Sequence, residues 1–339
     1  MKHIILFYFL STILVTPIIS SLNFVYAQDP SQSNKLTEKE KSFNIAIASD
    51  WGCNEDAKKT SQNIQNKNPE LVIAAGDLSY KGSADCWSNE ISPFKSKLKI
   101  AMGDHDYDDT LGGKIGVINE YLDPLNLGKT YYSFNLYNAH LVFMDPYLDY
   151  GPGSDQYQFI ANDLKNAFKN SKIDWTFVVE HIPIYTSPSK HPSDSSIRDL
   201  FHPLFDKYGV DLVFSGDNHN YQRTFPLKYN NNGGYSNPLI SNKDTNKYNN
   251  GDGVIYIISG TAGRSLYEIK EQSYFVSKQD DKNFGFLNID IKGKSLKGIF
   301  YPNSDSNYKH IGVDNNNNIV DQFSISKENN GSDKEFNNL

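Results

Sequence analysis

Acidic, imidazole and phenol side chains fall directly after five predicted strands. They lie in segments 49–52, 76–80, 103–106, 178–181 and 216–223. Because open α/β sheets place their ligands at the carboxyl ends of the strands, we expect these side chains to meet at one edge. Donors gathered so closely would repel one another or stay unpaired without a cation. The pattern therefore predicts a metal site.

Each segment taken alone has an ordinary structural explanation. Gly-Asp after a strand is a common turn, and Asp217-Asn218 would also suit a plain turn. A single His after a strand is more often a hydrogen-bonded residue at the rim than a metal ligand. The occurrence of all five segments in order is what favours the metal site.

The elements that would position these side chains form two similar halves. Strands are predicted over 43–48, 71–75, 98–102, 131–136, 140–144, 175–179 and 210–214, and helices over 55–67, 84–97, 154–169 and 195–208. Alternating strands and helices indicate largely parallel sheets covered on both faces. Plain strands follow over 254–259, 285–291, 296–301 and 320–325. We therefore expect the α/β class, with two packed sheets and helices outside. The Asn- and Gly-rich stretch 229–253 is predicted to be a long surface excursion.

Composition excludes several classes of protein. The 339 residues are 38% hydrophobic and carry 33 basic against 40 acidic side chains, a net charge of −7. This balance argues against a dedicated nucleic-acid binder. The mean hydropathy is −0.56, and beyond the N-terminus no apolar run approaches a membrane span. Two cysteines exclude a disulfide-dense scaffold and a four-thiolate zinc site.

The N-terminal segment 1–27 has the pattern of an export signal. Lys2 is followed by an apolar stretch over 4–19 and by a small-residue cleavage site at 25–27. The alternative is an uncleaved anchor helix. Residues 28–42 are predicted to be a linker, 43–326 the folded domain and 327–339 a polar tail. We expect a secreted or cell-surface protein that keeps no membrane span after cleavage.

Export would permit a disulfide between the only two cysteines, Cys53 and Cys86. Each follows a candidate ligand segment, so both should lie at the same rim of the sheet. A bridge between them would close a loop of 33 residues. Two free thiols are the alternative.

The ordered motifs resemble the calcineurin-like metallophosphoesterase superfamily, and within it the purple acid phosphatases. The family pattern is an Asp after the first strand, then G-D-x-x-Y, G-N-H-[DE], V-x-x-H and G-H-x-H. The Asp50-Trp51-Gly52 opening and the lack of a separate N-terminal β domain look most similar to the short, tartrate-resistant type. The resemblance implies a four-layer α/β/β/α sandwich of two mixed sheets flanked by helices.

The resemblance also implies a dinuclear metal centre. The first metal, expected to be Fe(III), would be held by Asp50, Asp77, Tyr80 and His219. Asp77 would bridge to a second metal that is also held by Asp104, His181 and Asp217. The implied reaction is hydrolysis of a small phosphomonoester by attack of a metal-bound hydroxide. A phosphodiesterase or nucleotide hydrolase on the same scaffold is the alternative.

Two departures from the family pattern fall in the second metal site. Asp104 stands where the family has Asn, and Asp217 where it has the first His of G-H-x-H. Each change adds a negative charge, which shifts the expected metal from Zn(II) toward Mn(II), Fe(II), Mg(II) or even Ca(II). The alternative is a degraded second site in a non-catalytic protein that binds metal or phosphate.

Two histidines are candidates for contact with substrate. His105, with Asp106 beside it, is predicted to act as general acid toward the leaving group. The alternative is that His105 only orients Asp104. His191 would face the substrate from the loop after His181. Arg223 would either support the site through an acid or contact phosphate, and the oligomeric state is not predicted.

Overall fold

The computed structural model describes residues 41–81, 83–107, 117–230, 237–304 and 319–328. The predicted signal over 1–27 lies outside these residues, as do nearly all of the predicted linker and the tail beyond residue 328.

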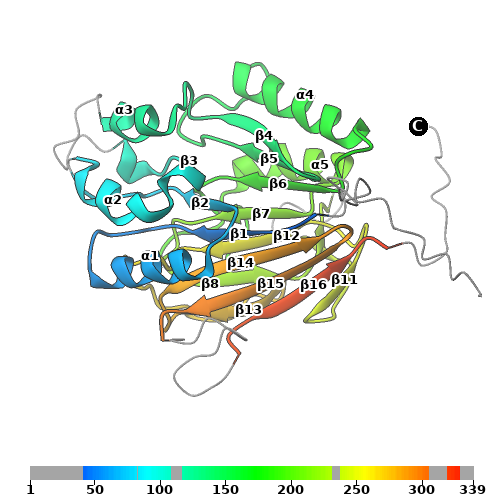
Figure 1. The fold of residues 1–339 in the computed structure, drawn as a ribbon. Coiled ribbons are helices and arrows are strands. Elements are labelled where there is room, and N and C mark those ends of the chain that lie inside the picture. Colours follow the sequence, from blue (N-terminus) through cyan, green and yellow to red (C-terminus); the bar gives the residue numbers. More distant parts are fainter. Residues whose placement is uncertain (1–40, 82, 108–116, 231–236, 305–318, 329–339) are drawn as a thin grey trace, which may run out of the picture. The chain divides into compact units, whose positions relative to one another are not determined.

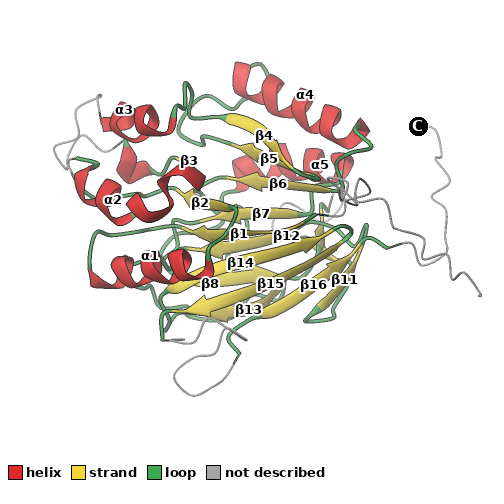
Figure 2. Ribbon diagram, in the orientation of Figure 1, coloured by secondary structure: helices red, strands yellow, loops and turns green. Residues whose placement is uncertain are grey.

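Two seven-stranded sheets make up the described part of the chain (Figure 1, Figure 2). The first has the order β11-β16-β15-β14-β1-β2-β3 and the second β13-β8-β12-β7-β6-β5-β4. The strands of the first are β1 (Ser42–Ala48), β2 (Leu71–Ala75), β3 (Leu98–Ala101), β11 (Lys247–Asn249), β14 (Gly285–Lys292), β15 (Ser295–Pro302) and β16 (Gln322–Ser326). Those of the second are β4 (Tyr132–Leu136), β5 (Ala139–Phe143), β6 (Trp175–Val179), β7 (Leu212–Ser215), β8 (Tyr221–Thr224), β12 (Ile255–Ser259) and β13 (Val276–Asp280). A short ribbon pairs β9 (Leu227–Lys228) with β10 (Leu239–Ile240).

Helices cover the outer face of each sheet. They are α1 (Glu55–Lys67), α2 (Asp85–Glu90), α3 (Val117–Leu122), α4 (Asp155–Lys169) and α5 (Ser195–Tyr208), with 3-10 turns over Ser92–Lys97, Asp104–Asp106 and Asp123–Leu125. None of these helices is long and apolar enough to cross a bilayer.

Strand alternation explains the layers. Ile45 and Ile47 of β1 pack in a core shared with Phe177 of β6, between the two sheets. Ala46 and Ala48, which point the other way, pack in a second core beneath α1 and α2. A third core lies between the second sheet and helices α4 and α5. The arrangement is the four-layer α/β/β/α sandwich that the sequence predicts.

Parallel pairing brings the ligand segments to one rim. β1, β2 and β3 run parallel in the first sheet, and β5, β6, β7 and β12 do so in the second. The Ser49 N–H donates to the Ser259 carbonyl, 2.9 Å away, and so ties the end of β1 to the end of β12. The carboxyl ends of both sheets therefore open onto the same site.

Two sequence predictions need correction. The helix expected over 84–97 is divided at Ile91, because Pro93 enters a separate 3-10 turn there. The stretch 229–253 is not wholly a surface excursion, since β11 pairs with β16 and Tyr248 is buried in the core between the sheets. Strands β8 and β13 were also not predicted, because polar residues interrupt their apolar pattern.

Candidate metal centre

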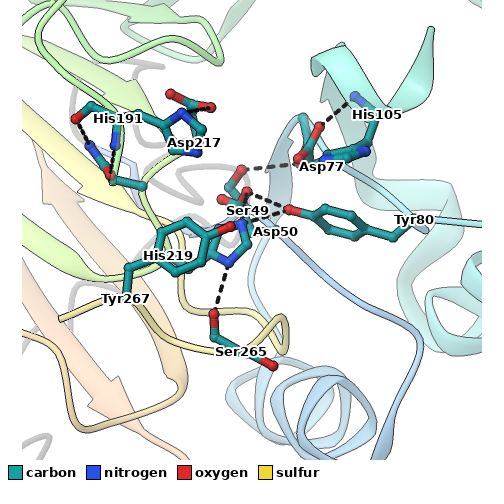
Figure 3. Close-up of polar contacts among 12 residues, drawn as sticks. Ser49, Asp50, Asp77, Tyr80, His105, His191, Asp217, His219, Ser265 and Tyr267 are labelled. Atoms are coloured by element: carbon teal, nitrogen blue, oxygen red, sulfur yellow. Dashed lines mark hydrogen bonds and ion pairs between the residues drawn. The ribbon is translucent and has the colours of Figure 1, made fainter. Parts of the chain in front are cut away.

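The candidate ligands gather at the shared rim of the two sheets (Figure 3). Their donor atoms form three overlapping groups, each within 4.8 Å: Asp50, Asp77 and His219; Asp77, Asp104 and His105; and Asp104, His181 and Asp217. Asp77 and Asp104 each belong to two groups. The arrangement is therefore continuous, as a pair of neighbouring ions would require.

The first group is closed around Asp50. The Tyr80 hydroxyl donates to Asp50 Oδ1 over 2.9 Å and lies 2.9 Å from His219 Nε2. His219 Nε2 is 3.3 Å from the same carboxylate oxygen. Asp50 is fully buried, so three donors of different chemistry, a carboxylate, a phenol and an imidazole, converge away from bulk water.

The ligands predicted for the second metal, Asp77, Asp104, His181 and Asp217, form the second group, and this group is more open. His181 Nε2 lies 3.4 Å from Asp77 Oδ1 and 3.7 Å from Asp104 Oδ1. On the far side, His191 Nδ1 lies 3.7 Å from Asp217 Oδ1. The Asp104 side chain is 53% exposed, whereas that of His181 is fully buried. The centre is therefore open to solvent on the Asp104 side.

Four of the candidate ligands hold the left-handed backbone conformation. Their φ angles are +63° for Asp50, +53° for Asp77, +54° for Tyr80 and +64° for Asp217. This conformation is strained for residues other than glycine, and it gathers at functional sites where the surrounding fold maintains it. The turns after β1, β2 and β7 thus aim side chains inward at a cost in stability.

Neighbouring glycines leave the space that these side chains fill. A Cβ atom on Gly103 would overlap the Asp77 carboxylate, and one on Gly216 would overlap Ser49 Oγ and approach Asp50 Oδ2. A Cβ on Gly76 would overlap the His181 ring. The Gly-Asp pairs of the sequence are therefore required by close approach to the ligands as well as by the turn.

Backbone carbonyls fix the orientation of both buried imidazoles. His181 Nδ1 lies 2.8 Å from the Ala75 carbonyl, and His219 Nδ1 lies 2.8 Å from the Ser265 carbonyl. Each ring thus carries its proton on Nδ1 and turns Nε2 toward the carboxylates. This is how metal-binding histidines are usually held.

Burial and close charges together set the pKa values of the groups in the site. Burial alone would raise the pKa of Asp77, but its interactions with His181 outweigh burial and hold that pKa below its usual range. Burial would likewise lower the pKa of His181, but Asp77 and other carboxylates raise it. Burial, with Asp50 and Asp104 nearby, raises the pKa of Asp217 to about 7, although His181 opposes this. Burial and the nearby Asp50 carboxylate raise the pKa of the Tyr80 phenol. A bound cation would relieve this crowding of acids.

The residues present fit metal ions. Asp50 Oδ2 and His181 Nε2 are buried and make no hydrogen bond with any described residue. Leaving such atoms unsatisfied is costly unless a ligand completes them. The first group offers carboxylate, phenol and imidazole, which suit a hard transition metal. The second group offers three carboxylates and one imidazole, which suit Mn(II), Fe(II) or Mg(II).

The remaining predicted residues lie around this centre. The His105 N–H donates to Asp77 Oδ1 over 3.1 Å, and its ring packs 4.5 Å from that of Tyr80. Asp106 is buried, and its carboxylate accepts from the N–H groups of Asp77, Leu78 and Gly103. Asp106 therefore joins the loops after β2 and β3 and does not face the mouth of the site. Cys53 and Cys86 form a disulfide that links the segments following Asp50 and Tyr80.

Arg223 supports the two sheets and does not contact the centre. It is buried and pairs with Asp321, with Nε 2.6 Å from Oδ2. Because Arg223 lies on β8 and Asp321 directly precedes β16, the pair joins the two sheets.

Sequence reasoning missed several residues that border the centre. Tyr267 stacks on His219 with ring centroids 3.8 Å apart, and Ser265 supplies the carbonyl that orients the same histidine. Arg264 lies with its guanidinium 4.4 Å from the centre of the Tyr80 ring. The glycine-rich end of β12 was a signal for this segment. Tyr147 follows β5 and borders the second group, with its ring centroid 6.4 Å from that of His181. Its position at the end of a predicted strand could have indicated this.

Residues 43–221 match the family described as Calcineurin-like phosphoesterase. The chain belongs to this family. The matched residues contain all seven candidate metal ligands and nearly all of strands β1 to β7.

Two curated relatives of this chain are named as purple acid phosphatases. The chain is 27% identical over 201 residues to probable purple acid phosphatase 20 of Arabidopsis thaliana, covering 53% of this chain and 46% of that protein. It is 25% identical over 294 residues to probable inactive purple acid phosphatase 24 of the same plant, covering 79% and 45%. The chain thus spans about half the length of these curated relatives.

A solved structure of a purple acid phosphatase from yellow lupin (Lupinus luteus) seeds has the same fold. It superposes with a TM-score of 0.70 over 86% of this chain and 55% of that chain, at 22% identity. The fold of the phosphoesterase family is therefore present here, with candidate metal ligands at its rim.

Proposed function

We propose that the protein is an exported, metal-dependent phosphoesterase, an acid phosphatase that hydrolyses phosphomonoesters. The observation that carries this proposal is the continuous set of donor groups that share Asp77 and Asp104. Asp50, Asp77, Tyr80 and His219 would hold Fe(III), and Asp77, Asp104, His181 and Asp217 a second ion. When bound, the two metals would neutralise phosphoryl oxygens and lower the pKa of a bound water.

The chain's own residues then have separate tasks. Asp77 would bridge the two sites, while the Ala75 and Ser265 carbonyls keep both imidazoles aimed inward. His105, whose ring packs on Tyr80 at the mouth, would donate a proton to the departing oxygen. Asp106 would maintain the loops that carry these groups, and His191 would contact substrate beside Asp217.

The location and type of the enzyme are part of the proposal. The disulfide supports an extracytoplasmic location, because such bonds persist in oxidising compartments. The Asp50-Trp51-Gly52 sequence supports the short, tartrate-resistant type.

Hydrolysis of an aryl phosphate tests the function. The mature chain would be stripped with a chelator and titrated with iron and a second divalent ion. We expect turnover that needs two metals and is faster with Mn(II) or Fe(II) than with Zn(II). Asp77→Asn should abolish this turnover, and parental activity in that variant would show that the site is elsewhere.

The iron is tested by its colour. A tyrosinate bound to ferric iron absorbs visible light, so Tyr80→Phe should bleach that band while the protein stays folded. An unchanged band would remove Tyr80 from the ligand set.

A non-catalytic metal or phosphate binder is the second candidate. It is favoured by the inactive relatives and by Asp104 and Asp217, which place two extra acids in the second group. On this alternative the parent would bind one iron without turnover, and Asp104→Asn combined with Asp217→His would create activity. An active parent protein would exclude it.

A further inference from the structure

Arg264 lies at the mouth of the candidate metal centre, and its positive charge is unpaired in the described part of the chain. Its side chain is exposed, yet its guanidinium lies over the Tyr80 ring, 4.4 Å from the centroid. In the described part of the chain it makes no ion pair, and its side chain makes no hydrogen bond. Five N–H donors in a planar fork are therefore available to a ligand.

The backbone of Arg264 is fixed to the ligand loop. The N–H groups of Gly263 and Arg264 both donate to the Asp50 carbonyl, over 3.1 and 2.8 Å. Gly52 permits this approach, because a Cβ there would lie 3.0 Å from the Arg264 nitrogen. The guanidinium therefore starts from a rigid base one residue from Ser265, whose carbonyl orients His219.

The neighbouring cation differs from Arg264. Lys190 is also exposed, but its Nζ donates to the Tyr267 hydroxyl over 2.8 Å. Further hydrogen bonds join these two loops, from Ser189 Oγ to the Glu268 carbonyl and from the Lys270 N–H to the Pro188 carbonyl. Lys190 thus holds the rim together, whereas Arg264 remains free to bind.

Tyr80 brings Arg264 and His105 together. Both pack against its ring, His105 at 4.5 Å between centroids and Arg264 at 4.4 Å. A leaving group that takes its proton from His105 would therefore lie beside this ring, within reach of the exposed guanidinium. An anionic group two or three bonds beyond the departing oxygen would then meet the fork of Arg264.

We infer that Arg264 is a specificity-determining residue that selects phosphate esters or anhydrides whose leaving group carries a second anion, a phosphate or a carboxylate. The inference rests on the proposed function. Guanidinium binds both anions through paired N–H donors, so the shared chemistry is that of a planar oxyanion edge. In the reaction, water adds its oxygen to phosphorus and the phosphorus–oxygen bond to the leaving group breaks. Inorganic phosphate and the protonated leaving group are released.

The test compares leaving groups in matched variants. Pyrophosphate and phosphoenolpyruvate carry the second anion as phosphate and carboxylate, while p-nitrophenyl phosphate carries none. In Arg264→Gln we expect kcat/KM for the two anionic substrates to fall by about 10-fold relative to p-nitrophenyl phosphate, mostly through KM. Arg264→Lys should recover part of the loss, and Lys270→Gln, an exposed cation on the same loop, should lose nothing. A fall for only one substrate would name the preferred anion.

Binding supplies a readout that does not need turnover. Calorimetric titration of the metal-loaded protein with imidodiphosphate, an analogue resistant to hydrolysis, should give a Kd about 10-fold weaker in Arg264→Gln. The Kd for inorganic phosphate should stay the same. Equal ratios of the two Kd values in parent and variant would overturn the inference. A parent that binds imidodiphosphate through Arg264 but turns over no substrate would overturn the proposed function alone.

Discussion

Two charged clusters in this molecule differ in how completely their charges are paired. Between the sheets, Asp321 accepts from Arg223 and from the Tyr221 hydroxyl, and Arg223 also donates to the Tyr248 hydroxyl and the Thr245 carbonyl. At the rim, the carboxylates of Asp50, Asp77, Asp104 and Asp217 lie close together without a Lys or Arg partner among the described residues, and Asp50 Oδ2 and His181 Nε2 have no hydrogen-bond partner there. The first cluster is complete without a ligand, whereas the second is complete only with one.

The backbone shows the same contrast. Arg223 lies in strand β8, which pairs with β12 on one side and with β13 on the other. The rim carries its ligands on left-handed residues at Asp50, Asp77, Tyr80 and Asp217. Strain and uncompensated charge therefore occur together at the site of chemistry, while the inter-sheet network stabilises the fold that maintains them.

The largest effect is expected from breaking the complete cluster. Asp321→Ala leaves Arg223 buried without a carboxylate, which should lower the free energy of unfolding by about 3–5 kcal/mol. Equilibrium denaturation in urea measures this loss. Glu55→Ala, which removes an exposed partner of Lys58, should have a much smaller effect. An unchanged midpoint for Asp321→Ala would mean that the network contributes no stability.

The disulfide should matter nearly as much, because it restrains the loops of the incomplete cluster. Replacing both Cys53 and Cys86 by Ser should lower the free energy of unfolding by about 3–4 kcal/mol, as expected for a closed loop of this length. Denaturation of the parent with and without a reductant provides the same comparison without mutation. Equal midpoints for oxidised and reduced parent would contradict the prediction.

Substitution within the incomplete cluster should act in the opposite direction on stability. Burial among other acids raises the pKa of Asp217 to about 7, above its unfolded value, so its ionised form costs stability at pH 8. Asp217→Asn should therefore leave the metal-free protein as stable as the parent or more so at pH 8, by up to about 1 kcal/mol.

The same variant should lose affinity for the second metal. Calorimetric titration of Mn(II) into the stripped protein should show binding weakened by about 10-fold or more, because one ligand charge is gone. Glu268→Gln, which removes an exposed acid from the rim loop, is the matched control. A metal-free Asp217→Asn protein that is strongly destabilised would show that the two clusters do not differ as described.

Part of this contrast could be predicted from the sequence, and the features that could not be predicted were missed for physical reasons. The rim could be located because five predicted strands end in segments that carry Asp or His. Side chains at the carboxyl ends of parallel strands converge regardless of loop conformation. The two-sheet architecture followed from runs such as 71–75 and 175–179, whose bounds match β2 and β6.

Long-range pairing was what the sequence left open. Arg223 and Asp321 are 98 residues apart, and nothing local marks them as partners. Tyr248 was assigned to a surface excursion because the Asn-rich residues around it hide a three-residue strand. Arg264 follows a glycine turn, and only its contact with Tyr80, which lies in the segment after β2, indicates a role at the metal centre.

The smallest effect concerns an acid that belongs to neither cluster. Glu90 is partly buried beside the disulfide, its Oε2 has no hydrogen-bond partner among the described residues, and burial raises its pKa to about 7. Since this pKa exceeds the unfolded value, the folded state keeps a proton that the unfolded state releases, and stability falls as pH rises from about 4.5 to 7. Glu90→Gln should therefore raise the free energy of unfolding at pH 7.5 by about 1 kcal/mol or less, once the solvent exposure of Glu90 is allowed for, and by almost nothing at pH 4.5. Glu70→Gln is the control, because the Glu70 carboxylate already accepts a bond from the Asn44 N–H. Denaturation at the two pH values decides the matter: an equal effect at both would mean that folding does not raise the pKa of Glu90.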